Sequence, residues 1–196
     1  GFETTMPPNA LAAKMAKKKK LHNFSLLVSH VLVPPAVEAI MSDPETCVDG
    51  LLAAGHVCSI TGTSEYGPLT EKVKIPVVIT GFEPLDLLQG ILMTVRQLEN
   101  GESKLENQYS RIVKPEGNPS AMEVAYSVFE PTDMEWRGLG IIPKSGMKLK
   151  KEYEAYDARL KFSLSVTIVE TETECIAGEI LKGVKKPNQC PAFGIR

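Results

Sequence analysis

Two cysteines near the end of the chain have the residue types and surroundings of a metal-cluster site. Cys175 and Cys190 are separated by 14 residues, and glycine or proline lies close to each of them. Thiolates are soft ligands for zinc or iron–sulfur clusters, and flexible flanking residues let backbone amides bend toward the sulfurs. Because Pro191 follows Cys190 in a segment with excess positive charge, the pattern favours iron–sulfur over zinc. Either site needs about four ligands, so spacing alone favours two unrelated thiols or a disulfide.

The other two cysteines lie far from this pair in the sequence. Cys47 is predicted in a turn, and Cys58 follows a predicted strand, so we interpret both as bystanders. Four unevenly placed cysteines are too few for a disulfide scaffold and indicate a reducing compartment. We therefore expect a cytoplasmic protein.

A Gly-Phe-Glu sequence occurs twice, each time at the start of a predicted helix. The copies are residues 1–5, Gly-Phe-Glu-Thr-Thr, and residues 81–86, Gly-Phe-Glu-Pro-Leu-Asp. The second copy follows a predicted strand, and open α/β sheets bind ligands at the carboxyl ends of their strands. The alternative is that Glu3 and Glu83 are only helix-start acids that offset the helix dipole, and the residues alone favour neither reading. The candidate site residues from these copies are Glu3, Thr4, Thr5, Glu83 and Asp86.

Two histidines lie at or just after predicted strand ends. His30 occurs in Ser-His-Val-Leu-Val-Pro-Pro, and His56 occurs in Ala-Ala-Gly-His-Val. A single histidine in such a place is more often a packed, hydrogen-bonded residue than a ligand. Together with the Gly-Phe-Glu carboxylates at the same predicted sheet edge, however, His30 and His56 indicate a polar cleft.

Composition excludes several classes of function. Lys plus Arg is 22 and Asp plus Glu is 24, so the net charge of −2 argues against a nucleic-acid binder. No apolar run approaches the ~18 residues needed to span a bilayer, and no secretory signal is recognisable, so we expect no membrane association. The sequence also contains neither a Gly-x-Gly-x-x-Gly or phosphate-loop motif nor a Gly-x-Ser-x-Gly motif.

Five lysines fall within residues 14–20, and Lys17 to Lys20 are consecutive. An apolar helix face that includes Leu11 and Met15 leads into this run. We therefore interpret the lysines as the solvated last turn of a helix, where cations offset the dipole, rather than as a nucleic-acid or targeting patch.

The first hundred residues alternate between short β-rich runs and helical patterns, which is typical of βαβ units on a parallel sheet. Prolines and N-cap residues mark the helix starts, and an apolar face marks 84–98 as the clearest helix. The predicted strands are 24–28, 48–54 and 75–80, and the predicted helices are 10–20, 36–41, 66–73 and 84–98.

After Gly101 the pattern is less regular. We predict a strand over 106–113, helices over 120–129 and 152–160, and an irregular segment over 131–152. The fold class is therefore α/β, with an open, mainly parallel sheet, flanking helices and an irregular C-terminal segment that bears cysteines. The predicted domains are an α/β domain over 1–100, a second α/β or connecting segment over 101–160, and a partial iron–sulfur region over 161–196.

Five motifs, in order along nearly the whole chain, resemble the HypD family of [NiFe]-hydrogenase maturation factors. They are Gly-Phe-Glu-Thr-Thr, Ser-His-Val-Leu-Val-Pro-Pro-Ala, Ala-Gly-His-Val, Gly-Phe-Glu-Pro-Leu-Asp and the Cys-x14-Cys-Pro-Ala-Phe-Gly ending. The resemblance implies parallel α/β domains and a region that holds a [4Fe–4S] cluster. It also implies a scaffold and redox role, more than conventional enzyme turnover, in assembly of the Fe(CN)2CO iron group. The partners it implies are a HypC-type chaperone and a HypE-type cyanide donor.

The resemblance also predicts which residues take part. Cys175 and Cys190 match two cluster ligands, and Glu3, Thr4, Thr5, His30, His56, Glu83 and Asp86 would line a cleft around the transient iron. The family's Cys-Gly-Thr-His-Glu-His and Gly-Pro-Gly-Cys-Pro-Val-Cys motifs are not in the chain, nor is the cysteine that the family has shortly after Phe193-Gly194. We therefore expect an internal fragment of a longer protein, with an incomplete set of cluster ligands.

Two other classes of function remain. An α/β enzyme for thiol–disulfide or phosphate-ester chemistry would explain polar residues at strand ends, although the chain contains neither a Cys-x-x-Cys motif nor a phosphate loop. An interaction module stapled by zinc would explain the late cysteines, but it would need two further ligands.

Overall fold

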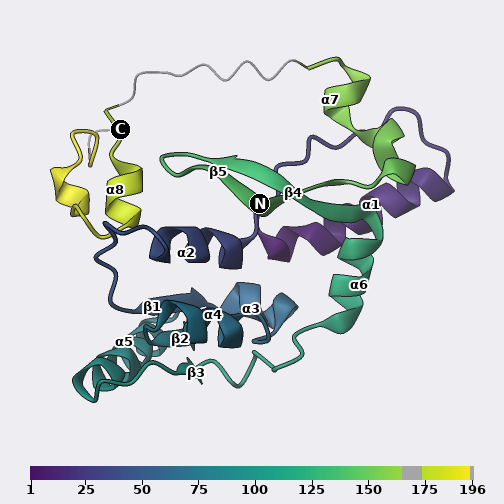
Figure 1. The fold of residues 1–196 in the computed structure, drawn as a ribbon. Coiled ribbons are helices and arrows are strands. Elements are labelled where there is room, and N and C mark those ends of the chain that lie inside the picture. Colours follow the sequence, from purple (N-terminus) through teal and green to yellow (C-terminus); the bar gives the residue numbers. More distant parts are fainter. Residues whose placement is uncertain (165–173, 195–196) are drawn as a thin grey trace.

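The computed structural model describes residues 1–164 and 174–194 and has the α/β architecture that the sequence predicts (Figure 1). Its strands are β1 (Leu51–Ala54), β2 (Val77–Thr80), β3 (Leu105–Asn107), β4 (Phe129–Trp136) and β5 (Gly140–Leu149). Its α-helices are α1 (Met6–Lys18), α2 (Val33–Met41), α3 (Gly55–Thr61), α4 (Tyr66–Val73), α5 (Pro84–Glu99), α6 (Pro119–Val128), α7 (Ala158–Lys161) and α8 (Ala177–Leu181). Three 3-10 helices are η1 (Glu3–Thr5), η2 (Lys151–Tyr156) and η3 (Pro187–Gln189).

A three-stranded parallel sheet with the order β1-β2-β3 forms the first hydrophobic core. The central strand β2 pairs with both neighbours, and its residues Val77, Val78 and Ile79 are fully buried. Such continuous β-branched runs are typical of parallel strands that are covered on both faces. Residues from α3 and α4, including Cys58 and Tyr66, complete this core.

The second hydrophobic core lies under the antiparallel hairpin of β4 and β5. Helix α1 contributes Met6, Ala10 and Ala13 to this core, and α6 packs against α1. Small alanines on the α1 face let the two helices approach closely. Helix α2 contacts both α4 and β5, and η1 contacts α3, so these short elements join the two cores.

Helix α5 is amphipathic, as its sequence predicts, but its apolar stripe faces outward. The buried face consists of Asp86, Gly90, Thr94 and Gln97, and α5 packs on β1 and β2. A Cβ atom at Gly90 would lie 3.1 Å from the Cβ of Thr80, so a small residue is what permits this close contact. The apolar side chains that remain 43% to 66% exposed are Leu85, Leu88, Ile91, Leu92, Val95 and Leu98.

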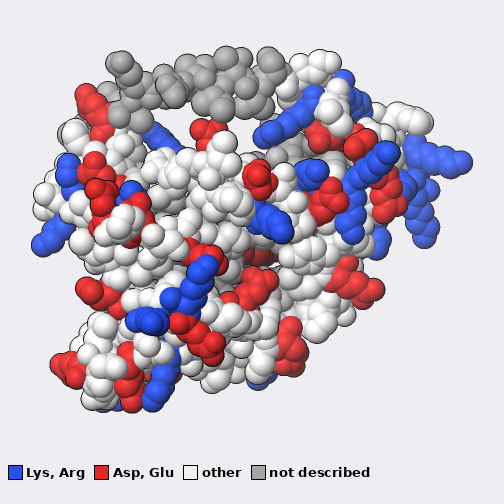
Figure 2. Space-filling model, viewed as in Figure 1, with Lys and Arg blue, Asp and Glu red and all other residues white. Residues whose placement is uncertain are grey.

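The lysine run ends α1, as predicted. The helix stops at Lys18, and Lys20 adopts a left-handed conformation with φ of 52°. Lys17 pairs with Glu152 at 2.7 Å and lies over the ring of Tyr153. Figure 2 shows positive side chains gathered at the right-hand edge, over this end of α1. Among the described residues, no helix is both long and apolar enough to cross a bilayer.

The prediction of an irregular segment over 131–152 is wrong, because β4 and β5 form a hairpin there. Gly138 and Gly140 have φ of 78° and 75°, a backbone region that glycine adopts readily and that tight hairpin connections require. A register shift between Thr132 and Met134 interrupts the pairing. This shift obscures the alternation of residues that would otherwise mark the strand.

Other predicted elements also differ from the structure. Residues 24–28 form no strand, because only Leu26 makes a bridge, to Asp157. The strand predicted over 106–113 ends at Asn107, whose amide donates a hydrogen bond to the Val113 carbonyl and holds the chain in a turn. The helix predicted over 152–160 is divided at Asp157, which is extended and caps α7.

Gly55 and Gly67 provide a matched pair of positions for a test of packing. A Cβ at Gly55 would lie 2.6 Å from the Thr80 carbonyl oxygen, whereas a Cβ at Gly67 would have no neighbour within 4 Å. We expect Gly55→Ala to lower the free energy of unfolding by about 1–3 kcal/mol, because the backbone oxygen must move. Gly67→Ala should raise it by roughly 0.5–1 kcal/mol, because alanine loses less entropy in a helix. Urea denaturation would measure both, and equal effects would contradict the packing at Gly55.

Candidate functional site

His30 is held in a small hydrogen-bonded group next to η1. Its Nδ1 lies 3.2 Å from Thr5 Oγ1, and its Nε2 lies 3.2 Å from Asn9 Nδ2. Since the Thr5 hydroxyl donates to the Phe2 carbonyl, all three bonds are satisfied when Nδ1 carries the proton and Nε2 accepts from Asn9. The ring also contacts Phe129 edge-on, and burial lowers the pKa of His30, so the neutral form is favoured. A cavity of about 280 Å³ lies beside this group.

Glu3 is almost fully buried, with 1% of its surface exposed. Its Oε1 accepts a hydrogen bond from the Val33 N–H at 2.7 Å, so the carboxylate binds the first residue of α2. Its Oε2 has no hydrogen-bond partner among the described residues. Burial raises the pKa of Glu3, and repulsion from Glu65 acts in the same direction. Thr4 is half-buried beside it.

The Glu3 carboxyl lies close to two further buried groups. Tyr66 and Cys58 are both fully buried in the core of the parallel sheet. Burial raises the pKa of the Cys58 thiol to about 11, and Glu3 adds to the shift. A thiol of this kind is unreactive, which agrees with its interpretation as a bystander.

His56, Glu83 and Asp86 lie where β1 and β2 end, as the sequence predicts. His56 is on the first turn of α3, directly after β1, and its ring lies 4.8 Å from that of Phe82. Glu83 precedes α5, where its backbone carbonyl accepts the Leu87 N–H. The side chains of His56, Phe82 and Glu83 are exposed. They form the open part of this edge.

Asp86 is the buried charge at the same edge, with a side chain that is 5% exposed. Its two oxygens accept hydrogen bonds from Arg111 at 2.7 and 2.6 Å, and Gln108 donates to it at 2.9 Å. These bonds from Arg111 and then Gln108 lower the pKa of Asp86. The guanidinium also lies over the ring of Tyr109.

Sequence reasoning missed Gln108, Tyr109 and Arg111. These residues follow β3, so they lie at the carboxyl end of the third parallel strand. A strand predicted over 106–113 places them within the sheet, whereas a strand that stops at Asn107 places them at its edge. The Tyr109 ring packs against the backbone of Gly55 and Gly81. A Cβ atom added at Gly55 would lie 2.6 Å from a carbon of this ring, and one added at Gly81 would lie 2.7 Å from it. This contact explains why glycine follows both β1 and β2.

The predicted cleft residues therefore form two groups in the structure. Glu3 and Thr5 belong to η1 and His30 bonds to Thr5, whereas His56, Glu83 and Asp86 lie at the edge of the parallel sheet. Helix α3 begins at the sheet edge and packs against η1, so it connects the two groups. That all of them line one cleft stays a prediction.

Cys175 and Cys190 lie together beside α8. The sulfur of Cys190 accepts hydrogen bonds from the backbone N–H groups of Ile176 and Ala192, which lower its pKa, and the Cys175 side chain also bonds to it. Backbone amides directed at a sulfur in this way stabilise a thiolate. Within the described residues, no group of three His, Cys, Asp or Glu side chains is close enough to hold a metal ion.

Ion pairs and a backbone hydrogen bond attach this cysteine segment to the loop after α2. Lys182 pairs with Asp43 at 2.6 Å, and both side chains are about three-quarters buried. The Lys182 carbonyl also accepts the Cys47 N–H at 2.7 Å. The loop after α2 therefore positions α8, and Cys47 contributes its backbone to this contact.

Comparison with known proteins places the whole chain in one group. Residues 1–196 match the HypD family model, which is described as "Hydrogenase formation hypA family". The chain is 46% identical over 201 residues to hydrogenase maturation factor HypD2 of Bradyrhizobium diazoefficiens, an alignment that covers 99% of the chain and 53% of the relative. It is 42% identical to HypD of Rhizobium leguminosarum bv. viciae and 40% identical to HypD of Escherichia coli K12, with 99% of the chain and 52% of each relative covered. The chain thus spans about half the length of these curated relatives.

The buried carboxyl of Glu3 predicts a specific pH dependence of stability. A pKa that is raised in the folded state adds stability below the unfolded value of 4.5, and this contribution is lost as the pH rises through the folded pKa. Glutamine keeps the oxygen that accepts the Val33 N–H but cannot ionise. We therefore expect the free energy of unfolding of Glu3→Gln to rise relative to that of the unchanged chain as the pH increases above 4.5. The slope of this difference is at most about 1.4 kcal/mol for each pH unit.

Urea denaturation at several pH values between 4 and 8 would measure this difference. Glu99→Gln, at an exposed position in the last turn of α5, is the matched control and should leave the pH dependence unchanged. A stability difference for Glu3→Gln that does not vary with pH would contradict the raised pKa.

Proposed function

Because the chain belongs to the HypD family of hydrogenase maturation factors, we propose that it is part of a scaffold for assembly of the Fe(CN)2CO group of [NiFe]-hydrogenase. The match over the whole chain is the observation that supports this function most strongly. In this proposal the intact protein works in the cytoplasm with a HypC-type chaperone and a HypE-type cyanide donor. The iron group is the cargo of the scaffold, not a resident cofactor.

The cysteine segment fits part of a [4Fe–4S] site. Cys175 and Cys190 are adjacent, and backbone N–H groups hydrogen-bond the Cys190 sulfur, an interaction that tunes the reduction potential of iron–sulfur clusters. These two residues would be two of the cluster's four ligands. A bound cluster would supply one-electron transfer, and the Asp43–Lys182 pair would hold its segment against the loop after α2.

The two polar groups suggest different tasks around the cargo. The exposed His56 and Glu83 are free to contact a ligand or a partner at the sheet edge. Asp86 is already bound by Arg111 and Gln108, so its task is to position the start of α5 and the segment after β3. Neutral His30, which has its Nδ1 proton directed at Thr5, would hold rather than transfer a proton.

Two other functions were compatible with the sequence. The proximity of Cys175 and Cys190 also suits a thiol–disulfide enzyme, and the lowered pKa of Cys190 is the observation in its favour. A zinc-stapled module would need two ligands in addition to these cysteines. The family assignment favours the maturation scaffold over both.

A maturation assay would test the roles of His30 and Glu83. Alanine at either aligned position of a full-length relative should reduce hydrogenase maturation at least about tenfold, while the iron–sulfur absorption stays unchanged. Alanine at the position that aligns with exposed Glu99 is the control and should mature hydrogenase normally. Normal maturation by both variants would remove these residues from the site.

Cluster reconstitution would test the ligand set. We expect residues 1–196 alone to form no stable cluster under anaerobic conditions with iron and sulfide, because two thiolates leave two coordination positions open. A full-length relative treated in parallel should give the broad visible absorption of a [4Fe–4S] cluster. One stoichiometric cluster on the 196-residue chain would contradict the proposed ligands.

A further inference from the structure

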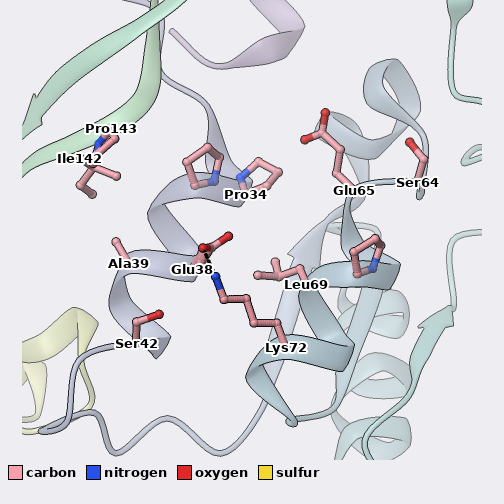
Figure 3. Close-up of a pocket in the computed structure, with 12 residues that line it drawn as sticks. Pro34, Glu38, Ala39, Ser42, Ser64, Glu65, Leu69, Lys72, Ile142 and Pro143 are labelled. Atoms are coloured by element: carbon pink, nitrogen blue, oxygen red, sulfur yellow. Dashed lines mark hydrogen bonds and ion pairs between the residues drawn. The ribbon is translucent and has the colours of Figure 1, made fainter.

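A groove of about 710 Å³ lies between α2 and α4, beside the Ile142-Pro143 segment of β5 (Figure 3). Its apolar walls are formed by Pro34, Pro35, Pro68, Leu69, Ile142 and Pro143. Proline has no backbone N–H and a fixed φ, so these walls are stiff and offer few donors. A stiff apolar groove of this size is suited to bind a ligand without first rearranging.

The charges around the groove are unbalanced. Glu38 of α2 and Lys72 of α4 form an ion pair that joins the two helices (Figure 3). Glu65 also lines the groove, and among the described residues its carboxylate has neither an ion pair nor a hydrogen bond. Among the described residues that line the groove, Lys72 is the single cation and is already paired with Glu38, so the Glu65 carboxylate has no counter-charge there.

The position of Glu65 makes its unpaired state informative. It occupies the N-cap position of α4, where an acidic side chain normally accepts a backbone N–H, yet it makes no such bond. In Figure 3 its carboxylate points away from α4. The side chain of Glu65 lies at the open surface of the groove, where a ligand can reach it. This end of the groove therefore favours a cation.

The length of the groove indicates the form of its occupant. Lining residues run from Pro34 to Ser42, along α2 and its C-cap, and from Ser64 to Lys72, which includes the first two turns of α4. At ~1.5 Å per helical residue this is about 12 Å, which accommodates three or four residues of extended chain at ~3.3 Å each.

We propose that this groove binds an extended segment of a partner protein in which a lysine or arginine is flanked by apolar residues. The apolar side chains pack on the prolines and Leu69, and the basic group pairs with Glu65. This surface uses none of the residues assigned to the iron cargo or the cluster. The proposal therefore does not rest on the maturation function.

Peptide titrations followed by NMR would test this inference on the 196-residue chain. The probes are Val-Leu-Lys-Val, with acetylated and amidated ends, and the same peptide with norleucine or glutamate in place of lysine. The lysine peptide should shift the amide signals of Ala39, Leu69 and Ile142. Its dissociation constant should be about fivefold lower than that of the norleucine peptide, because a partly desolvated ion pair is gained. The glutamate peptide should bind more weakly than both.

Matched variants assign the effect to Glu65. Glu65→Gln should remove the difference between the lysine and norleucine peptides, whereas Glu71→Gln, at an exposed α4 position outside the groove, should keep it. Ala39→Trp should fill the groove and abolish binding of both peptides, and Ser42→Trp serves the same purpose if the first variant does not fold.

Several outcomes would overturn the proposal. These are an unchanged lysine preference in Glu65→Gln, equal binding of the glutamate peptide, or signal shifts outside the groove. Binding of n-butylamine as tightly as the peptide would show a site for small amines instead. Shifts of the same residues with protein concentration alone would show that a second copy of the chain occupies the groove.

Discussion

The burial of β2 on both faces and along both edges constrains the rest of the parallel-sheet core. Val77, Val78 and Ile79 are fully enclosed by β1, β3 and helices, so every connection must leave the sheet at the ends of the strands. Because the three strands are parallel, the segments after β1, β2 and β3 emerge at one edge. His56, Asp86 and Arg111 come from these three segments. Their proximity is thus a consequence of strand direction.

A buried carboxylate has a comparable role between the two cores. Glu3 bonds to the first residue of α2, and η1 packs against α3, so one short segment contacts both the hairpin core and the sheet core. Buried charges are costly unless they are paired or neutral, and the raised pKa of Glu3 reflects that cost. The two copies of Gly-Phe-Glu therefore differ in environment, since Glu83 is exposed and Glu3 is enclosed.

Local signals predicted most of the first half of the chain. The helix expected over 66–73 has those bounds, and prolines mark the starts of α2 and α5 as expected. The hairpin of β4 and β5 was missed because a shift in pairing disrupts the strand alternation, which is the main local signal for a strand. The Arg111–Asp86 pair was missed for another reason. Its partners are 25 residues apart, and only tertiary structure brings them together. The adjacency of Cys175 and Cys190 likewise depends on the fold of the segment between them.

The outward apolar stripe of α5 has a consequence for the colloidal behaviour of the isolated chain. Leu85, Leu88, Leu92 and Val95 follow a three- and four-residue spacing, so they form a continuous ridge in contact with water. A net charge of −2 gives the molecules little mutual repulsion. Sulfate and similar salts strengthen contacts between such ridges. We therefore expect this ridge to lower the solubility of the isolated 196-residue chain, and added sulfate to lower it further.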